Sequence, residues 1–203
     1  MKKPLHLVFV TDPMCSWCWG MAGEFAKARE ILKDRVTFEL MLGGINPHGT
    51  QPIGDYGRRL MMRLWQQVEA TTGQEFGYSL PDEYVHNSTR TCVAIEAFRQ
   101  ISDVPPFEYL ELLQQLFFVD AINVTEETVL RKAAENCGVD PEELGRAMQT
   151  PAIVERVRFQ FNNAQTFGTQ VLPNLLIEGE GGALRLFGGG YMDAAMIESQ
   201  LPN

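Results

Sequence analysis

The first 42 residues contain two short apolar runs separated by an amphipathic segment, and this order constrains the fold most strongly. Residues 5–11, "LHLVFVT", and 36–42, "VTFELML", are rich in β-branched and aromatic residues, as is typical of buried strands. Between them, apolar residues recur at helical spacing over 15–32. Because a strand, a helix and a strand in such short succession form a βαβ unit, we predict two parallel strands.

The middle of the chain carries only helical patterns. Amphipathic segments are predicted to begin near Tyr56, Ser88, Phe107, Thr125 and Asp140. Ser88, Thr125 and Asp140 are residue types that cap helix N-termini, and Pro141 suits a first helical turn. We therefore predict that residues 46–150 form an all-helical domain inserted into another domain.

The last quarter of the chain returns to strands. The elements expected there are a helix over 150–167, strands over 174–178 and 183–187, and a closing helix over 191–201. The glycine-rich "GEGG" between the two strands predicts an antiparallel hairpin. The expected fold is therefore α/β, with a mixed four-stranded sheet in the order βαβ–αββα. Residues 1–45 and 151–203 would form this domain around the 46–150 insertion.

Charge and hydropathy exclude two classes of partner. The net charge is −9, and no basic cluster exceeds two residues, which argues against nucleic acid. No segment approaches the ~20 apolar residues that span a bilayer. The first ten residues resemble a signal peptide, but the apolar run is short, contains His6 and lacks a small-residue cleavage site. We expect a cytoplasmic protein.

The segment "DPMCSWCWG", residues 12–20, contains a Cys-x-x-Cys pair where the first strand gives way to the helix. Cys15 at the helix start would be stabilised as a thiolate by unpaired backbone N–H groups and the helix dipole. Cys18, one turn further on, is close enough to form a disulfide with it. The first thiol could attack a disulfide and the second could resolve the mixed disulfide. Asp12 would oppose thiolate formation if its side chain pointed inward.

A zinc site and an inert buried pair are the alternatives for these cysteines. Zinc requires about four ligands, yet Cys92 and Cys137 lie 45 residues apart, and His6, His48 and His86 have no ligand-like spacing. We therefore predict no metal site. Cys92 and Cys137 are expected to be small buried hydrophobic residues, and His86 to lie in a surface loop.

These features together resemble a known family. A Cys-x-x-Cys after the first strand, a helical insertion, and the turn "VLPN" at 171–174 before a β-hairpin resemble the DsbA-like branch of the thioredoxin superfamily. The form of residues 12–20 is most similar to cytoplasmic members described as predicted protein-disulfide isomerases, related to FrnE. The resemblance spans essentially the whole chain and implies a thioredoxin fold.

The resemblance also implies roles for individual residues. Cys15 would be the nucleophile and Cys18 the resolving thiol. Pro173 would be a cis-proline packed against the pair, leaving the backbone of Leu172 to bind an extended substrate. Ser16 and Trp17 would contact substrate. Met14 and Trp19, with Trp17, would give the site an apolar rim, although Trp19 suits the core equally well.

Two departures from the family pattern qualify this expectation. The best-known DsbA has Pro-His between its cysteines, whereas Ser16 and Trp17 supply no positive group, so we do not expect a powerful oxidant. DsbA proteins keep a buried acidic residue in the first strand, and Phe9 occupies that position here. Glu39 in the second strand is a weak substitute that we expect to face solvent.

The expected function is that of a DsbA-type thiol–disulfide oxidoreductase or isomerase acting on protein or peptide thiols and disulfides. The Cys15–Cys18 disulfide would be its only redox group, with no separate cofactor and with glutathione as a possible co-substrate. A glutathione-dependent transferase or isomerase on the same fold and a non-catalytic thioredoxin-like binding module remain alternatives. A monomer and a homodimer are both compatible with the sequence.

Overall fold

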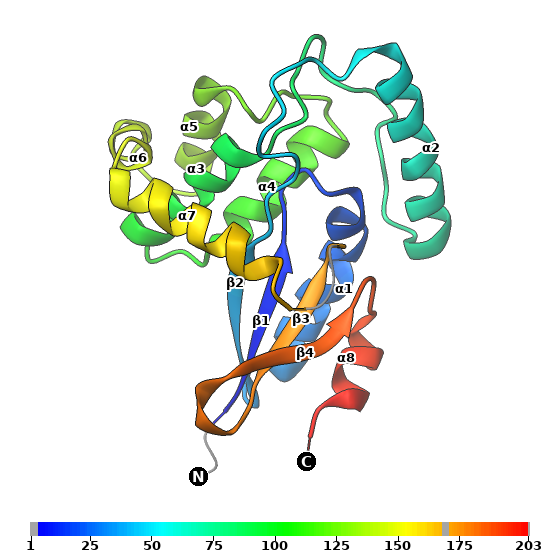
Figure 1. The fold of residues 1–203 in the computed structure, drawn as a ribbon, viewed down its shortest axis with the longest axis vertical. Coiled ribbons are helices and arrows are strands. Elements are labelled where there is room, and N and C mark those ends of the chain that lie inside the picture. The colour runs from blue at the N-terminus through cyan, green and yellow to red at the C-terminus, as the bar shows by residue number, and fades with distance from the viewer. Residues whose placement is uncertain (1–3, 168–170, 203) are drawn as a thin grey trace.

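The computed structural model describes residues 4–167 and 171–202, in which four strands form one mixed sheet (Figure 1). The strands are β1 (Leu5–Thr11), β2 (Val36–Leu42), β3 (Asn174–Glu178) and β4 (Leu184–Gly189), in the order β2-β1-β3-β4. Strand β1 pairs in parallel with β2 and antiparallel with β3, which pairs antiparallel with β4. The predicted α/β fold with a mixed four-stranded sheet is confirmed.

One face of the sheet is covered by the helix that begins at the cysteine pair. Helix α1 (Ser16–Leu32) packs its Phe25 ring against Phe9 of β1, with the ring centroids 3.9 Å apart. Helix α8 (Ala194–Gln200) packs beside α1. Because successive side chains of a strand point to opposite faces, every second residue of β1 lies on this α1 side.

The opposite face is covered by α7 (Pro151–Ala164). Val8 and Val10 of β1 form a smaller core there with Leu176 and Ala164. The Gln160 side chain also accepts a hydrogen bond from the backbone N–H of Leu42 at 3.0 Å. Helix α7 is therefore tied to the end of β2.

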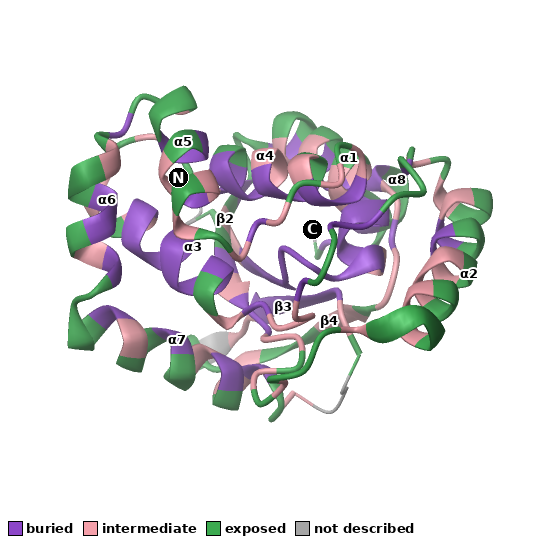
Figure 2. Ribbon diagram, turned by 90° about the horizontal axis from the view of Figure 1, so that it is seen from above, coloured by how far each residue is buried: buried purple, intermediate pink, exposed green. Residues whose placement is uncertain are grey.

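Residues 46–150, which we propose as an inserted unit, contain five helices among the described residues. They are α2 (Gly54–Thr72), α3 (Thr89–Ile101), α4 (Pro106–Phe118), α5 (Glu127–Asn136) and α6 (Pro141–Met148). One cluster of buried residues includes members of the sheet and of these helices, and Figure 2 shows buried residues in purple. Helix α2 lies against α1 (Figure 1), and its Trp65 ring packs on Phe118 of α4 with the centroids 5.6 Å apart. No helix in the described ranges combines the length and apolar character needed to cross a membrane.

Of the helix caps predicted from the sequence, the one at Asp140 is confirmed and the one at Thr125 is wrong. The Asp140 side chain caps α6 by accepting a hydrogen bond from the Glu142 N–H at 2.9 Å, as predicted. Thr125 was expected to cap α5, but α5 begins two residues later. The reason is local: the N–H and hydroxyl of Thr125 both bond to the Asn123 side chain in a preceding turn.

Candidate active site

The two cysteines of the motif occupy different environments at the start of α1. Cys15 is the N-cap residue with extended backbone angles, and its carbonyl accepts the first helical hydrogen bond, from the Trp19 N–H at 3.0 Å. Its side chain keeps a little surface at 8% exposure, whereas Cys18 is fully buried. Both are free thiols. Of the pair, Cys15 is the sulfur that a large substrate can reach.

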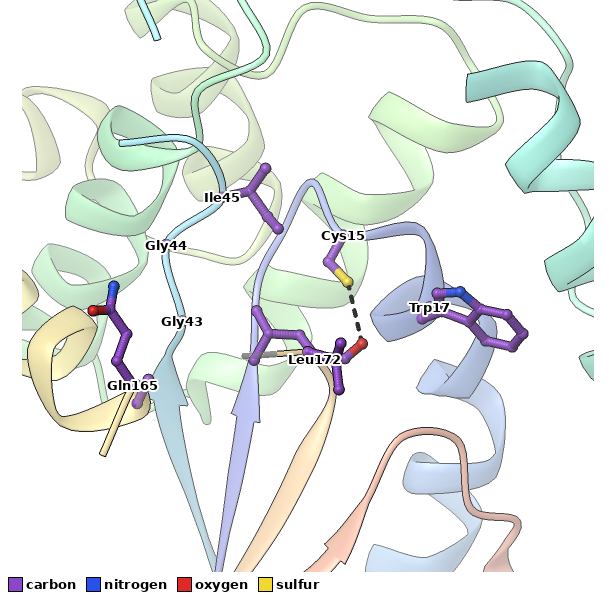
Figure 3. Close-up of a pocket in the computed structure, with 9 residues that line it drawn as sticks. Cys15, Trp17, Gly43, Gly44, Ile45, Gln165 and Leu172 are labelled. Carbon is purple, nitrogen blue, oxygen red and sulfur yellow. Dashed lines mark hydrogen bonds between the residues drawn. The ribbon is translucent and has the colours of Figure 1, made fainter. Parts of the chain in front are cut away.

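A segment distant in sequence lies opposite Cys15. The Leu172–Pro173 peptide bond is cis, which confirms the predicted geometry of Pro173. The Cys15 thiol donates to the Leu172 carbonyl oxygen at 3.8 Å (Figure 3). Pro173 itself is buried next to Leu172. The fold therefore brings Cys15 together with the turn that the sequence singled out.

Cys15 opens into a cavity of about 510 Å³ between α1, the end of β2 and the end of α7. Figure 3 shows this cavity, whose lining residues are Cys15, Trp17, Gly43, Gly44, Ile45, Ala164, Gln165, Val171 and Leu172. None of them carries a charged side chain. Gly43 and Gly44, which form one wall of the cavity, were not predicted as site residues. In the sequence they appear only as a glycine pair after a strand.

Both glycines of this wall are closely packed. A Cβ on Gly43 would lie 2.4 Å from the Leu172 side chain. Gly44 has a φ of +77°, in the left-handed region that other residues rarely adopt, and a Cβ there would lie 2.7 Å from Phe161. Side chains at these positions would fill the cavity beside Cys15.

Ser16 and Trp17 lie on different sides of α1. Trp17 is half-buried and lines the cavity. Ser16 is buried and faces α2, where its hydroxyl oxygen accepts a hydrogen bond from Trp65 Nε1 at 3.2 Å. The Ser16 hydroxyl also donates to Met61 Sδ at 3.5 Å. The structure thus joins the dipeptide between the cysteines to the proposed insertion, and Ser16 is absent from the cavity lining.

Met14 and Trp19 belong to the core, so the apolar rim expected from them is wrong. Met14 is 1% exposed, and Trp19 stacks on Phe118 with centroids 6.1 Å apart. The indole N–H of Trp19 donates to the Glu75 carbonyl at 2.8 Å. Of the three residues predicted to form the apolar rim, Trp17 is the one that lines the cavity.

Asp12 points inward and is fully buried. One carboxylate oxygen accepts from the Met14 N–H at 2.8 Å. The other accepts from the Ile45 N–H at 2.9 Å, from the Ser88 hydroxyl at 2.5 Å and from the Cys92 thiol at 3.6 Å. Burial raises the pKa of Asp12, and these hydrogen bonds oppose the rise. Ser88 is the N-cap residue of α3 as predicted, but its hydroxyl bonds to Asp12 and makes no cap hydrogen bond to the helix.

The buried acidic residue that was expected in the first strand is thus displaced to Asp12. Phe9, at the expected position, is a core residue stacked on Phe25. Glu39 is about half exposed and pairs with His6 Nε2 at 3.0 Å, so it faces solvent as predicted. Sequence reasoning noted Asp12 but had no signal for its direction, because three of its four partners are remote in sequence.

The environment of Cys18 differs from that of Cys15. Burial raises the pKa of Cys18 well above its ordinary value, and the nearby Cys15 and Asp12 add to this rise. The Thr11 hydroxyl acts in the opposite direction and lowers it. Cys18 is therefore held as a neutral thiol behind the more accessible Cys15.

The remaining predicted residues lie outside this cavity. Cys92 is buried as expected, but Cys137 is only half-buried. His86 lies in a loop as expected but is half-buried, because its ring packs against Tyr84 and Phe117, and burial lowers its pKa to about 4. Within 4–167 and 171–202, no three His, Cys, Asp or Glu side chains are grouped so that they could hold a metal ion.

Solved structures share this architecture. A candidate protein disulfide isomerase from Nitrosomonas europaea superposes with a TM-score of 0.88 and 25% identity, over 98% of this chain and 96% of that chain. The cytosolic disulfide reductase DsbM from Pseudomonas aeruginosa gives 0.76 and 24%, over 91% and 89% of the two chains. DsbM has also been solved with glutathione.

Sequence comparison gives more distant relatives and a family. The ClpXP adapter protein SpxH of Bacillus subtilis (strain 168) is 22% identical over 181 residues, or 86% of this chain. The chain spans 58% to 61% of the length of the curated relatives it matches. The model of the DSBA-like thioredoxin domain matches residues 6–200. With its thioredoxin-type sheet and nearly the whole chain matched, the protein belongs to the DSBA-like thioredoxin domain family.

Proposed function

We propose that this protein is a thiol–disulfide oxidoreductase of DsbA type, with Cys15 as the nucleophile and Cys18 as the resolving thiol. The observation that carries the proposal is the asymmetry of the pair. Cys15 reaches a cavity at the start of α1, whereas Cys18 is fully buried one helical turn behind it. Such an arrangement lets a bulky disulfide meet only the first sulfur and leaves the second for an internal attack.

The reaction follows from this asymmetry. The Cys15 thiolate attacks one sulfur of a substrate disulfide, and the substrate S–S bond breaks. The departing substrate thiolate takes up a proton. Cys18 then loses its proton and attacks Cys15 Sγ, the mixed disulfide breaks, and the second substrate thiolate is released and protonated. The substrate is reduced by two electrons as the Cys15–Cys18 disulfide forms, and the reverse sequence oxidises a dithiol.

The cavity favours a cysteine within an extended polypeptide. Trp17, Val171 and Leu172 offer apolar surface beside Cys15, and Val171 is 63% exposed. The Leu172 carbonyl already accepts from the Cys15 thiol and would be available to a substrate backbone once that thiol reacts. Glutathione is the alternative thiol substrate, supported by the structure of DsbM with glutathione. No further cofactor is proposed.

Reduction in the cytoplasm is the direction we propose. The dipeptide Ser16–Trp17 places no cation beside Cys15 that would stabilise its thiolate and make the pair strongly oxidising. DsbM, which shares the fold, is a cytosolic disulfide reductase. Both observations support a moderately or strongly reducing pair.

A binding module is the second candidate function, because the curated relatives are ClpXP adapter proteins. An adapter that uses the fold only as a scaffold would still bind its partner protein after Cys15 and Cys18 are replaced. Loss of disulfide exchange with retained partner binding in the Cys15→Ser/Cys18→Ser variant would favour this second function.

A trapping experiment tests the proposed function. The Cys18→Ser variant, incubated with a peptide disulfide, should accumulate close to one mixed disulfide per chain at Cys15, because its resolving thiol is missing. Peptide mass spectrometry locates the adduct. Cys137→Ser is the matched control, since it removes the half-buried thiol outside the site, and it should turn over without accumulating adduct. An adduct on Cys137, or none on Cys15, would contradict the proposal.

A further inference from the structure

Thr11 is the last residue of β1 and lies on the face of the sheet that α1 covers. Side chains on a strand alternate, so Thr11 lies on the same face as Phe9, which stacks on Phe25 of α1. Cys18 precedes Phe25 by seven residues, about two helical turns, and therefore lies on the same face of α1. Thr11 and Cys18 are both 0% exposed. The alternation of the strand and the period of the helix thus bring the two side chains together.

The hydroxyl of Thr11 is not committed to any other group. Its Oγ1 atom is buried and has no hydrogen-bond partner among the described residues. Buried hydroxyls in folded proteins are normally paired, so an unpaired one calls for an explanation. Burial, Cys15 and Asp12 all raise the pKa of Cys18, whereas the interaction with the Thr11 hydroxyl lowers it. Thr11 Oγ1 makes no hydrogen bond to the neutral Cys18 thiol, so its proton is available to be donated when that buried thiol ionises.

We propose that Thr11 is a catalytic residue of the resolution step, in which its hydroxyl donates a hydrogen bond to the Cys18 thiolate as that thiolate attacks the mixed disulfide on Cys15. This inference rests on the proposed function. A charge-assisted hydrogen bond is worth most where water is excluded, as it is around the fully buried Cys18. Cys15 is partly exposed to solvent, so the first step does not require this hydrogen bond.

The step balances without any further reactant. Cys18 loses its proton, its electron pair forms the bond to Cys15 Sγ, and the bond between Cys15 Sγ and the substrate sulfur breaks. The substrate leaves as a thiolate and takes up a proton. Thr11 keeps its own proton throughout and lowers only the energy of the buried thiolate. The net change is a mixed disulfide and a thiol converted into the Cys15–Cys18 disulfide and a substrate thiol.

The two thiol reactions can be timed separately with the aromatic disulfide dithiobis(nitrobenzoate), in a Cys137→Ser background that removes the half-buried competing thiol. Attack by Cys15 releases a first coloured thiolate, and resolution by Cys18 releases a second. In Thr11→Val, which replaces the hydroxyl by a methyl group of similar size, the first release should keep its rate. The second should slow by about tenfold, as expected for one lost hydrogen bond to a charged group. Its pH profile should move to higher pH, because the pKa of Cys18 loses its lowering influence.

Two further variants separate hydroxyl chemistry from packing. Thr11→Ser keeps the hydroxyl and should restore the second release to within about threefold of the wild-type rate. Thr89→Val makes the same atomic change at another buried hydroxyl without a partner in the described chain, on α3, and should alter neither release.

The possible failures are distinct. A second release in Thr11→Val as fast as in the parent, or a Thr11→Ser variant as slow as Thr11→Val, would overturn the role of Thr11 while leaving the proposed function standing. A parent protein that releases no second thiolate would overturn both.

Discussion

Replacing Cys15 by Ser should lower the rate of insulin disulfide reduction to that of the reducing buffer alone. Serine keeps the size of the side chain but supplies no thiolate, and removal of a covalent nucleophile typically costs on the order of a thousandfold or more. Because Cys15 is the accessible sulfur of the pair, no other group in the cavity can take over the attack. The rate of insulin precipitation with dithiothreitol as the electron source measures the effect.

The control for this prediction is Cys137→Ser, which should retain the wild-type rate because Cys137 lies outside the cavity. A thermal unfolding curve for each variant establishes that the fold is kept. An unimpaired rate in Cys15→Ser would show that insulin reduction proceeds elsewhere on the molecule, and the assignment of the nucleophile would fail.

The second large expected effect is a loss of stability caused by Glu96→Ala, a substitution in α3. Glu96 is 1% exposed and bonds to the Arg99 side chain. It also accepts from Gln100 and, on α7, from Gln160, each at 3.0 Å. Arg99 in turn donates to the Leu40 carbonyl of β2 at 2.8 Å. Removing this carboxylate leaves a largely buried arginine without its counter-ion, which should lower the free energy of unfolding by about 3 kcal/mol.

Urea denaturation measures this loss, and an unchanged slope with a lower midpoint would show that stability alone has changed. Glu135→Ala is the matched control, because Glu135 pairs with Lys132 on the exposed side of α5 and should contribute nothing measurable. If Glu96→Ala unfolds within about 1 kcal/mol of wild type, this network does not hold α3 and α7 to the edge of the sheet.

The parts of the fold that could be predicted are those encoded by short-range patterns of residue types in the sequence. The strands β1 and β2 show their β-branched and aromatic content directly, and the helical period after Cys15 places the cysteines at a strand–helix junction. Asp140 and Pro141 mark a helix start within two residues. Pro173 could be singled out because it precedes a strand in a chain that already carried the cysteine motif.

The parts that could not be predicted depend on contacts between distant residues. The partners of Asp12 include Ile45, Ser88 and Cys92, which lie 33, 76 and 80 residues away. Ser16 is held by Trp65, 49 residues away. No local period encodes such pairings, so the inward turn of Asp12 and the burial of Ser16 emerge only from the packed structure.

The same reason explains why His86 is more buried than expected, although it does lie in a loop. A polar residue between short segments suggests a loop at the surface. Tertiary packing instead places its ring against Tyr84 and Phe117, where burial favours the neutral form.

The central claim is that Cys15 and Cys18 cycle between dithiol and disulfide, and equilibration against glutathione buffers tests it most directly. Protein is held at graded ratios of reduced to oxidised glutathione, free thiols are trapped by alkylation, and each cysteine is quantified by peptide mass spectrometry. We expect both thiols to disappear together in one reversible transition, with no glutathione left on Cys15 in the wild-type protein. Thiols that stay free at every ratio, or a Cys15 that is glutathionylated while Cys18 remains free, would contradict the account.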